Sequence, residues 1–296
     1  MPEGGVDKIR IDVGNSGTTL RLFTGLAALF SRPFHFDGDA SIRQRPMGPL
    51  LAALEQLGVC VSATNGRCPL TVQGPIRGGA ATVAGTSSQF VSALLLAAPL
   101  AAGETRLVVT GLNERPYVEL TLDWLQRQGI RLEHASDLSR FTIPGGQHYR
   151  AFDRLLPADF STAAFPLLAA AITGGRIRLR NLDFADAQGD LAVFGFFEQM
   201  GVRIEHEGET VAMFAPGPLR AVELDLNATP DALPALAVAA SFAEGESLLG
   251  NVPQARIKEC DRIAAMACEL RKLGVRVTEL PDGLRIIGGR PRGAAV

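Results

Sequence analysis

Hydrophobic and polar positions follow the same order four times along this 296-residue chain. In each copy, an amphipathic helical pattern ends in glycine and is followed by an alternating strand, a turn and a second strand. Glycine at that point supplies the left-handed residue that commonly ends a helix. The glycines that end these predicted helices are Gly58, Gly129, Gly201 and Gly274, at spacings of 71, 72 and 73 residues. This period predicts a repeated supersecondary unit.

The first half of each copy is a loop of small residues that opens a strongly apolar helix. The helices are apolar nearly all round, which predicts that they are buried rather than amphipathic. A further strand follows each apolar helix, so each unit is predicted to be β-α-β-α-β-β over about 72 residues. The loops occupy 14–19, 85–90, 158–165 and 227–233, and the strands that follow the helices occupy 33–36, 105–109, 176–180 and 246–250.

Four such units predict an α/β fold with parallel helices inside and sheets around them. We expect two domains of two units each, over residues 1–156 and 157–296. The plainer alternative is a tandem duplication of α/β units that share no functional site.

Composition excludes several classes of protein. Hydrophobic residues make up 47%, and 29 basic against 31 acidic residues give a net charge of −2, which argues against a nucleic-acid-binding protein. The apolar runs 93–102 and 163–172 are too short to cross a bilayer. The four cysteines form no CxxC pair, which predicts reduced thiols, a cytoplasmic location and no zinc site.

The loops that open the apolar helices are rich in groups that bind anions. Parallel helices present their N–H groups and positive dipole ends on one face, where phosphate or carboxylate binds well. The alternative for each loop alone is simple helix capping. The groups that would serve are Asn15, Ser16, Gly17, Thr18 and Thr19 in the first loop, and Ser87, Ser88 and Gln89 one repeat later.

Cations and two carboxylates recur in the second loops of the units. Arginine forks suit carboxylate and phosphate, although a solvated face is the usual place for a charge run. For Arg43 the solvated face is favoured, and for Arg45, Lys258 and Arg262 an anion site is favoured. The loops also carry Arg115 and Arg256. Asp231 and Glu259 could transfer protons, although Asp231 on its own is best explained as an acid at a helix N-terminus.

Several motifs in order along the chain resemble the 5-enolpyruvylshikimate-3-phosphate synthase family. They are GNSGTTLR (14–21), IRQRPM (42–47), GTSSQF (85–90), RPYVELTL (115–122), QGD (188–190), ATPDALPALAVAASFAEG (228–245) and IKECDR (257–262). The resemblance implies an inside-out α/β barrel, enolpyruvyl transferase-like, with two domains of three units each. This chain would hold four of the six, without the family's Lys-Ser segment and His-Arg motif.

The resemblance also implies an activity: transfer of the enolpyruvyl group of phosphoenolpyruvate to the 5-hydroxyl of shikimate 3-phosphate, with release of phosphate. It implies no metal and no organic cofactor. Asp231 would accept the hydroxyl proton, Glu259 would assist proton transfer at the methylene carbon, and Lys258 would act with them. Shikimate 3-phosphate would bind Ser87, Ser88, Gln89, Tyr117, Asp231, Gln254 and Lys258. Phosphoenolpyruvate would bind Asn15, Gly17, Thr18, Arg45, Gln89 and Arg262.

Two residues depart from the family pattern. Glu114 stands where the family usually has a serine that contacts the substrate phosphate, and Gln254 replaces a usual asparagine. With fewer cations to offset two polyanionic substrates, we expect this chain to bind weakly and turn over poorly.

Other functions stay open. A UDP-N-acetylglucosamine enolpyruvyl transferase would share the fold, but it typically has a cysteine in a mobile loop near phosphoenolpyruvate. Here Cys60 and Cys68 fall in a predicted hairpin instead, and the SSQF motif also argues against this enzyme. A non-catalytic chain that binds ligands, or that pairs with a partner supplying further units, is a third possibility. Family members are usually monomeric, whereas exposed apolar surface at open barrel ends predicts self-association here.

Overall fold

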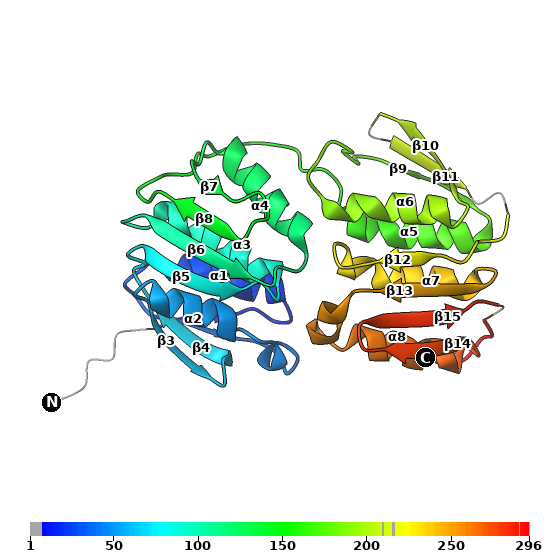
Figure 1. Ribbon diagram of the computed structural model, residues 1–296, viewed down its shortest axis with the longest axis horizontal. Coiled ribbons are helices and arrows are strands. Elements are labelled where there is room, and N and C mark those ends of the chain that lie inside the picture. The colour runs from blue at the N-terminus through cyan, green and yellow to red at the C-terminus, as the bar shows by residue number, and fades with distance from the viewer. Residues whose placement is uncertain (1–7, 209, 215–216, 290, 296) are drawn as a thin grey trace. The chain divides into compact units, whose positions relative to one another are not determined.

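Small mixed sheets alternate with helices in the computed structural model of the chain, which describes residues 8–208, 210–214, 217–289 and 291–295 (Figure 1). Within these residues there are three four-stranded sheets and one three-stranded sheet. The chain divides into two compact units, Met1–Phe152 (unit 1) and Asp153–Val296 (unit 2), and each has its own hydrophobic core. We describe each unit by itself.

Unit 1 contains two copies of the predicted β-α-β-α-β-β order. In each sheet the first two strands are parallel and the last two form an antiparallel hairpin that joins the second strand, in the orders β1-β2-β4-β3 and β5-β6-β8-β7. The first copy is β1 (Ile9–Asp12), α1 (Gly17–Ala27), β2 (Phe34–Asp37), α2 (Gly48–Gln56), β3 (Cys60–Thr64) and β4 (Arg67–Gln73). The second is β5 (Gly79–Ala84), α3 (Ser88–Ala97), β6 (Thr105–Thr110), α4 (Arg115–Arg127), β7 (Glu133–His134) and β8 (Arg140–Ile143).

Unit 2 repeats this order completely only once, in the sheet β12-β13-β15-β14. Its first part is α5 (Phe160–Thr173), β9 (Arg176–Leu179), α6 (Ala192–Gln199), β10 (Arg203–Glu207) and β11 (Thr210–Phe214). Its second part is β12 (Glu223–Asp225), α7 (Leu233–Phe242), β13 (Glu246–Gly250), α8 (Arg262–Lys272), β14 (Arg276–Leu280) and β15 (Gly283–Ile287).

The third repeat lacks the strand that was predicted to open it, so that prediction was wrong. The described segment 144–159 contains no strand, and the sheet has only the order β10-β11-β9. The Ala158 amide donates to the Asn181 carbonyl at 2.6 Å, and the Asn181 side chain donates to the Leu156 carbonyl at 2.9 Å. Pro157 lies between these two contacts and has no N–H to donate to a neighbouring strand. The two hydrogen bonds therefore take the place of the parallel strand pairing that was predicted.

The chain passes from unit 1 to unit 2 within this same segment. The Tyr149 hydroxyl donates to the Leu96 carbonyl at 2.8 Å, and the ring of Phe152 lies 5.6 Å from that of Trp124. These contacts hold residues 149–152 on unit 1, which accounts for a division after Phe152, four residues before the predicted boundary at 156.

The four predicted helix-ending glycines all have a left-handed backbone. Their φ angles are +87° at Gly58, +73° at Gly129, +94° at Gly201 and +77° at Gly274. Asn65 and Gly66, at φ 53° and 64°, form the turn of the predicted hairpin, which is β3-β4. The repeat could therefore be detected in the sequence, because each copy needs a glycine where its amphipathic helix ends.

The apolar helices are buried, as their composition predicted. In α3, eight of ten residues are buried, and in α7 seven of ten are buried. Helices α1 and α3 approach closely at Gly25, where a Cβ atom would lie 2.7 Å from the Ala93 carbonyl oxygen. Near the N-termini of the same two helices, Thr18 and Gln89 lie within hydrogen-bond distance of each other. Among the described residues, no helix is long and apolar enough to cross a membrane.

Candidate functional site

The loop before α1 holds its polar groups in a fixed arrangement. Ser16 caps the helix, because its hydroxyl accepts from the Thr19 amide at 3.1 Å. The Asn15 side chain donates to Asp39 Oδ2 at 2.6 Å and accepts from Arg45 Nη2 at 2.6 Å. Asp39 therefore fixes the amide orientation of Asn15 so that its oxygen faces Arg45.

Gln89 joins this loop to the N-terminus of α3. Its side-chain nitrogen donates to the Thr18 hydroxyl at 2.8 Å, and its oxygen accepts from Arg21 Nη1 at 2.7 Å. The structure therefore brings the loops 14–19 and 87–89 together, as expected of two equivalent helix N-termini in neighbouring repeats.

Two arginines lie buried beside each other at this place. Arg21 is 6% exposed and Arg45 is 9% exposed. Burial and the neighbouring charge of Arg45 lower the pKa of Arg21 to about 10, although the carboxylate of Glu114 acts in the opposite direction. Both Nε atoms are buried without a hydrogen-bond partner. Two close, partly unsatisfied guanidinium groups are a costly arrangement that an anion would relieve.

Gly17 lies against both guanidinium groups. A Cβ atom there would collide with Arg45 Nη1 and would lie 3.5 Å from Arg21 Nη1. The absence of a side chain at Gly17 therefore leaves the two cations room next to the first turn of α1.

At the N-terminus of α3, Ser88 contacts a buried carboxylate. The Ser88 hydroxyl donates to Glu114 Oε2 at 2.7 Å, and the Ser88 amide donates to the same atom at 3.3 Å. Ser87 is the N-cap residue, and its buried hydroxyl has no hydrogen-bond partner. Tyr117 lies in the first turn of α4, where its amide donates to the Glu114 carbonyl at 3.1 Å.

The predicted site residues of unit 2 gather around Arg262. Its Nη1 contacts Asp231 Oδ1 at 2.5 Å, and its Nε and Nη2 contact the two oxygens of Glu259 at 2.6 and 2.9 Å. Burial alone would lower the pKa of Arg262, but the contacts with Glu259 and Asp231 raise it above its ordinary value. The guanidinium group of Arg262 thus binds two carboxylates, one through Nη1 and the other through Nε and Nη2.

The turn that carries Asp231 differs in detail from the prediction. Pro230–Ala232 is one turn of 3-10 helix, and the α-helix begins only at Leu233. Thr229 takes the N-cap position, but its side chain does not cap the turn, and its buried hydroxyl has no partner. Pro234, the second residue of α7, has no N–H, so it suits the first turn of the helix, where no acceptor is needed.

The other two predicted residues of unit 2 lie at the 3-10 turn Pro253–Ile257 and directly after it. The side-chain nitrogen of Gln254 donates to the Asn227 carbonyl at 2.9 Å, while its buried Oε1 accepts no hydrogen bond. Lys258 follows this turn and is half-buried. Unit 2 thus brings Asp231, Glu259 and Arg262 into direct contact.

Three further loop arginines have structural partners. Arg43 forms a two-point contact with Asp37 at 2.8 and 2.6 Å, and Arg115 pairs with Glu119 at 2.8 Å. Arg256 contacts Asp261 at 2.7 Å and Glu279 at 3.0 Å. The preference for a solvated position at Arg43 agrees with its 54% exposed side chain.

Sequence reasoning missed two residues of the unit 1 site. Arg21 sits on the buried stripe of α1 with Gly17, Leu20 and Thr24, and a charge on such a stripe is a readable signal. Asp39 carried no such signal, because its partner Asn15 lies 24 residues earlier in the chain.

Comparison with known proteins decides the family. A sequence profile described as EPSP synthase (3-phosphoshikimate 1-carboxyvinyltransferase) matches residues 3–296. The chain belongs to the EPSP synthase family. A relative from Acetivibrio thermocellus named 3-phosphoshikimate 1-carboxyvinyltransferase is 48% identical over 285 residues, covering 96% of this chain and 67% of the relative. A relative of the same name from Ruminiclostridium cellulolyticum is 46% identical, covering 97% and 68%.

Solved structures of EPSP synthase are similar as well. That of EPSP synthase from Acinetobacter baumannii matches with a TM-score of 0.73 at 27% identity, covering 95% of this chain and 65% of that chain. The inside-out α/β fold predicted for the chain is thus the fold of the EPSP synthase family. The chain spans about two thirds of the length of these relatives.

Proposed function

We propose that this protein transfers the enolpyruvyl group of phosphoenolpyruvate to the 5-hydroxyl of shikimate 3-phosphate and releases phosphate, as a step of aromatic amino-acid biosynthesis. Its membership of the EPSP synthase family supports this activity. The observation that carries it is the pair of buried arginines, Arg21 and Arg45, whose guanidinium groups lie beside Gly17 at the N-terminus of α1. Both substrates are polyanions, and such a pair is built to hold anionic groups.

Phosphoenolpyruvate is proposed to bind at the first loop of unit 1. Arg45 would neutralise its carboxylate or phosphate, while Asn15 keeps the arginine in place through the 2.6 Å contact. Gly17 leaves space for the anion to approach the backbone, and Thr18 and Gln89 would donate the remaining hydrogen bonds. Arg262 of unit 2 is proposed to bind the same substrate.

Shikimate 3-phosphate is proposed to bind Ser87, Ser88, Gln89 and Tyr117 of unit 1. The unpartnered Ser87 hydroxyl supports a role in binding, because a buried donor without an acceptor is costly when the site is empty of substrate. Gln254, whose buried oxygen also lacks a donor, and Lys258 would contribute from unit 2.

Proton transfer is assigned to the carboxylates of unit 2, assisted by Lys258. Asp231 would accept the proton of the 5-hydroxyl as its oxygen bonds to C2 of phosphoenolpyruvate. Glu259 would deliver a proton to the methylene carbon C3 and later remove one from it. Phosphate then leaves from C2 as the carbon–carbon double bond forms again, and it takes up the proton that Asp231 accepted, so both carboxylates return to their starting states. Each carboxylate touches Arg262, which holds both side chains in place.

The test is product analysis by phosphorus and carbon NMR with the purified 296-residue chain. With both substrates present, we expect inorganic phosphate and the enolpyruvyl ether to appear in equal amounts, and neither to appear when one substrate is omitted. Binding of both substrates without turnover would favour the non-catalytic alternative. Turnover of a UDP-linked amino sugar in place of shikimate 3-phosphate would contradict the assigned acceptor.

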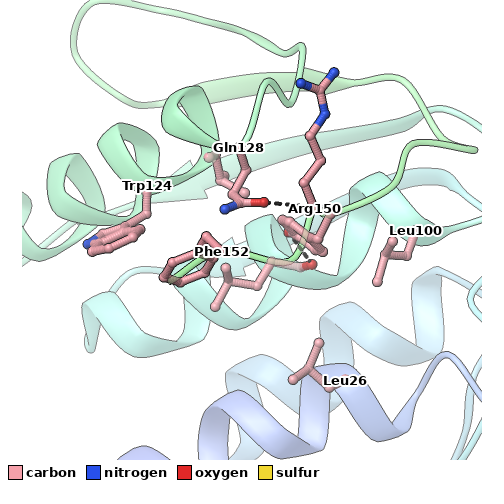
Figure 2. A pocket seen from close by; sticks show the side chains of 9 residues that line it. Leu26, Leu100, Trp124, Gln128, Arg150 and Phe152 are labelled. Carbon is pink, nitrogen blue, oxygen red and sulfur yellow. Dashed lines mark hydrogen bonds between the residues drawn. The ribbon is translucent and has the colours of Figure 1, made fainter. Parts of the chain in front are cut away.

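Self-association through apolar surface stays a prediction, and unit 1 offers a place for it. An apolar pocket of about 320 Å³ lies among Leu26, Leu96, Leu100 and Trp124, beside the 60% exposed Phe152 (Figure 2). None of the predicted site residues lines this pocket. Light scattering tests the prediction: a uniform monomer over a wide range of concentrations would contradict it. The predicted cytoplasmic location is likewise a proposal that fractionation of cells would test.

A further inference from the structure

Glu114 occupies an unusual position for a glutamate. It is 2% exposed, and it precedes α4 with φ 55° and ψ 40°, in the left-handed region that glutamate rarely adopts. A buried carboxylate in an unfavourable backbone conformation persists only when its surroundings hold it there.

The groups around Glu114 are hydrogen-bond donors at a helix N-terminus, which favour an anion. Its Oε2 accepts from both the hydroxyl and the amide of Ser88, the first residue of the ten-residue helix α3. The dipole of that helix favours negative charge at this end. The adjacent Ser87 hydroxyl is buried, has no partner and lies at the N-cap of the same helix. The N-terminus of α3 therefore has a hydroxyl group that the carboxylate does not bind.

The positive charge nearby also acts on Glu114. Of the charges that act on Arg21, that of Arg45 lowers its pKa and that of Glu114 raises it. Glu114 thus offsets part of the repulsion between the two buried arginines and serves as an internal anion.

Ser88 cannot serve two anions at once. One amide hydrogen and one hydroxyl hydrogen are its whole supply of donors, and both point to Glu114. An external phosphate at the same helix end would have to displace the carboxylate or lie next to a like charge.

We propose that Glu114 is a specificity-determining residue, an internal anion that competes with the phosphate group of the substrate for Ser88 at the N-terminus of α3. This inference rests on the proposed function where it names shikimate 3-phosphate. It follows that the wild-type chain binds the phosphorylated substrate less tightly than a chain with a neutral residue at position 114.

The experiment titrates the full chain with inorganic phosphate by calorimetry while NMR follows the Ser88 amide. The variants are Glu114→Ser, which removes the carboxylate and most of the side-chain volume, and Glu114→Gln, which keeps the volume and removes the charge. Glu133→Gln is the matched control, because it removes one exposed carboxylate from the same unit. We expect Glu114→Ser to bind phosphate about tenfold more tightly than wild type, equal to about 1.4 kcal/mol, and Glu114→Gln to lie in between.

A gain of about threefold or more with a shift of the Ser88 amide, absent in the control, supports the proposal. A smaller gain, or a gain without that shift, overturns it. If Glu114→Ser does not fold, Glu114→Gln is judged by the same criterion. Titration with shikimate 3-phosphate then separates the two claims. Tighter phosphate binding without any binding of shikimate 3-phosphate would sink the proposed function alone, and turnover without the gain would sink the role of Glu114 alone.

Discussion

The arginines of the two units differ in how their charge is compensated. In unit 1, Arg21 and Arg45 make their hydrogen bonds to the neutral side chains of Gln89 and Asn15. In unit 2, Arg262 makes its contacts with two carboxylates, Asp231 and Glu259. Arg21 and Arg262 are both largely buried, yet the pKa of Arg21 is lowered to about 10 while that of Arg262 is raised.

This difference indicates different tasks. Unit 1 holds two buried arginines whose charge Glu114 offsets only in part, so positive charge is left to attract an anionic ligand. Unit 2 uses its arginine to hold two carboxylates in fixed positions, which suits proton transfer. An anion that binds Arg262 has to share it with those carboxylates.

The largest expected effect concerns the carboxylates of unit 2. Asp231→Asn should reduce turnover by about 10²- to 10⁴-fold, because it removes the proposed proton acceptor. Phosphoenolpyruvate affinity should change little, since Arg262 remains in place. Steady-state kinetics with Glu223→Gln, an exposed carboxylate of the same unit, as control would measure this. Equal activity of Asp231→Asn and the control would exclude Asp231 as the proton acceptor.

The next effect concerns the positive charge of unit 1, which Glu114 offsets only in part. Arg45→Gln should weaken phosphoenolpyruvate binding by roughly 30- to 100-fold, as expected for a buried charge-assisted hydrogen bond. Arg43→Gln is the matched control, because Arg43 lies two residues away and already pairs with Asp37. Calorimetric titration of both variants with phosphoenolpyruvate would measure the two losses of affinity. Comparable losses in the two would mean that net charge, and not the buried site, attracts the ligand.

A smaller effect concerns the helix contact that holds the unit 1 loops together. Gly25→Ala should destabilise the chain by about 1–3 kcal/mol, because the new methyl group meets the Ala93 carbonyl oxygen, which is backbone and cannot rotate away. Urea unfolding would measure the loss. Gly48→Ala is the control, since nothing lies within 4 Å of a Cβ atom there. A loss no larger than that of the control would show that α1 and α3 separate easily.

The smallest expected effect is the loss of stability when the surface ion pair of Arg43 and Asp37 is removed. The hydrogen bond from Arg43 lowers the pKa of Asp37 from 3.8 to about 2. A carboxyl group with a lowered pKa stabilises the folded state above its unfolded pKa and loses that contribution as the pH falls through the folded value. Asp37→Asn should therefore lower Tm by roughly 1–3 °C at neutral pH. Thermal melts as a function of pH should show the difference vanish near pH 2, and a difference that persists there would contradict this account.

The sequence predicted much of the fold because local backbone rules repeat along it. Gly58, Gly129, Gly201 and Gly274 mark the same turn four times, and the apolar helices indicated their own burial. The absence of a strand before α5 could not be predicted from the repeat of about 72 residues, because that repeat implied a strand at this place. Pro157 was the only local sign against it.

The site was predictable in part, where a residue type alone carries the chemistry. The predicted residues Asn15 and Arg45 lie in contact, as do Asp231 and Arg262, while their roles in binding substrate stay predictions. The pairings themselves were not predictable, because Ser88 and Glu114 lie 26 residues apart and Asp231 and Arg262 lie 31 apart. Only the fold brings such residues to hydrogen-bond distance.

The most direct test of the central claim is the titration of Arg21 itself. Its side-chain carbon signal would be followed by NMR from about pH 8 to about pH 12 in selectively labelled protein, with and without saturating phosphoenolpyruvate. We predict a pKa of about 10 without the ligand and a higher value with it, because the anion offsets the repulsion from Arg45. An ordinary arginine pKa without ligand, or a value that the ligand leaves unchanged, would contradict the claim that unit 1 holds positive charge in readiness for an anion.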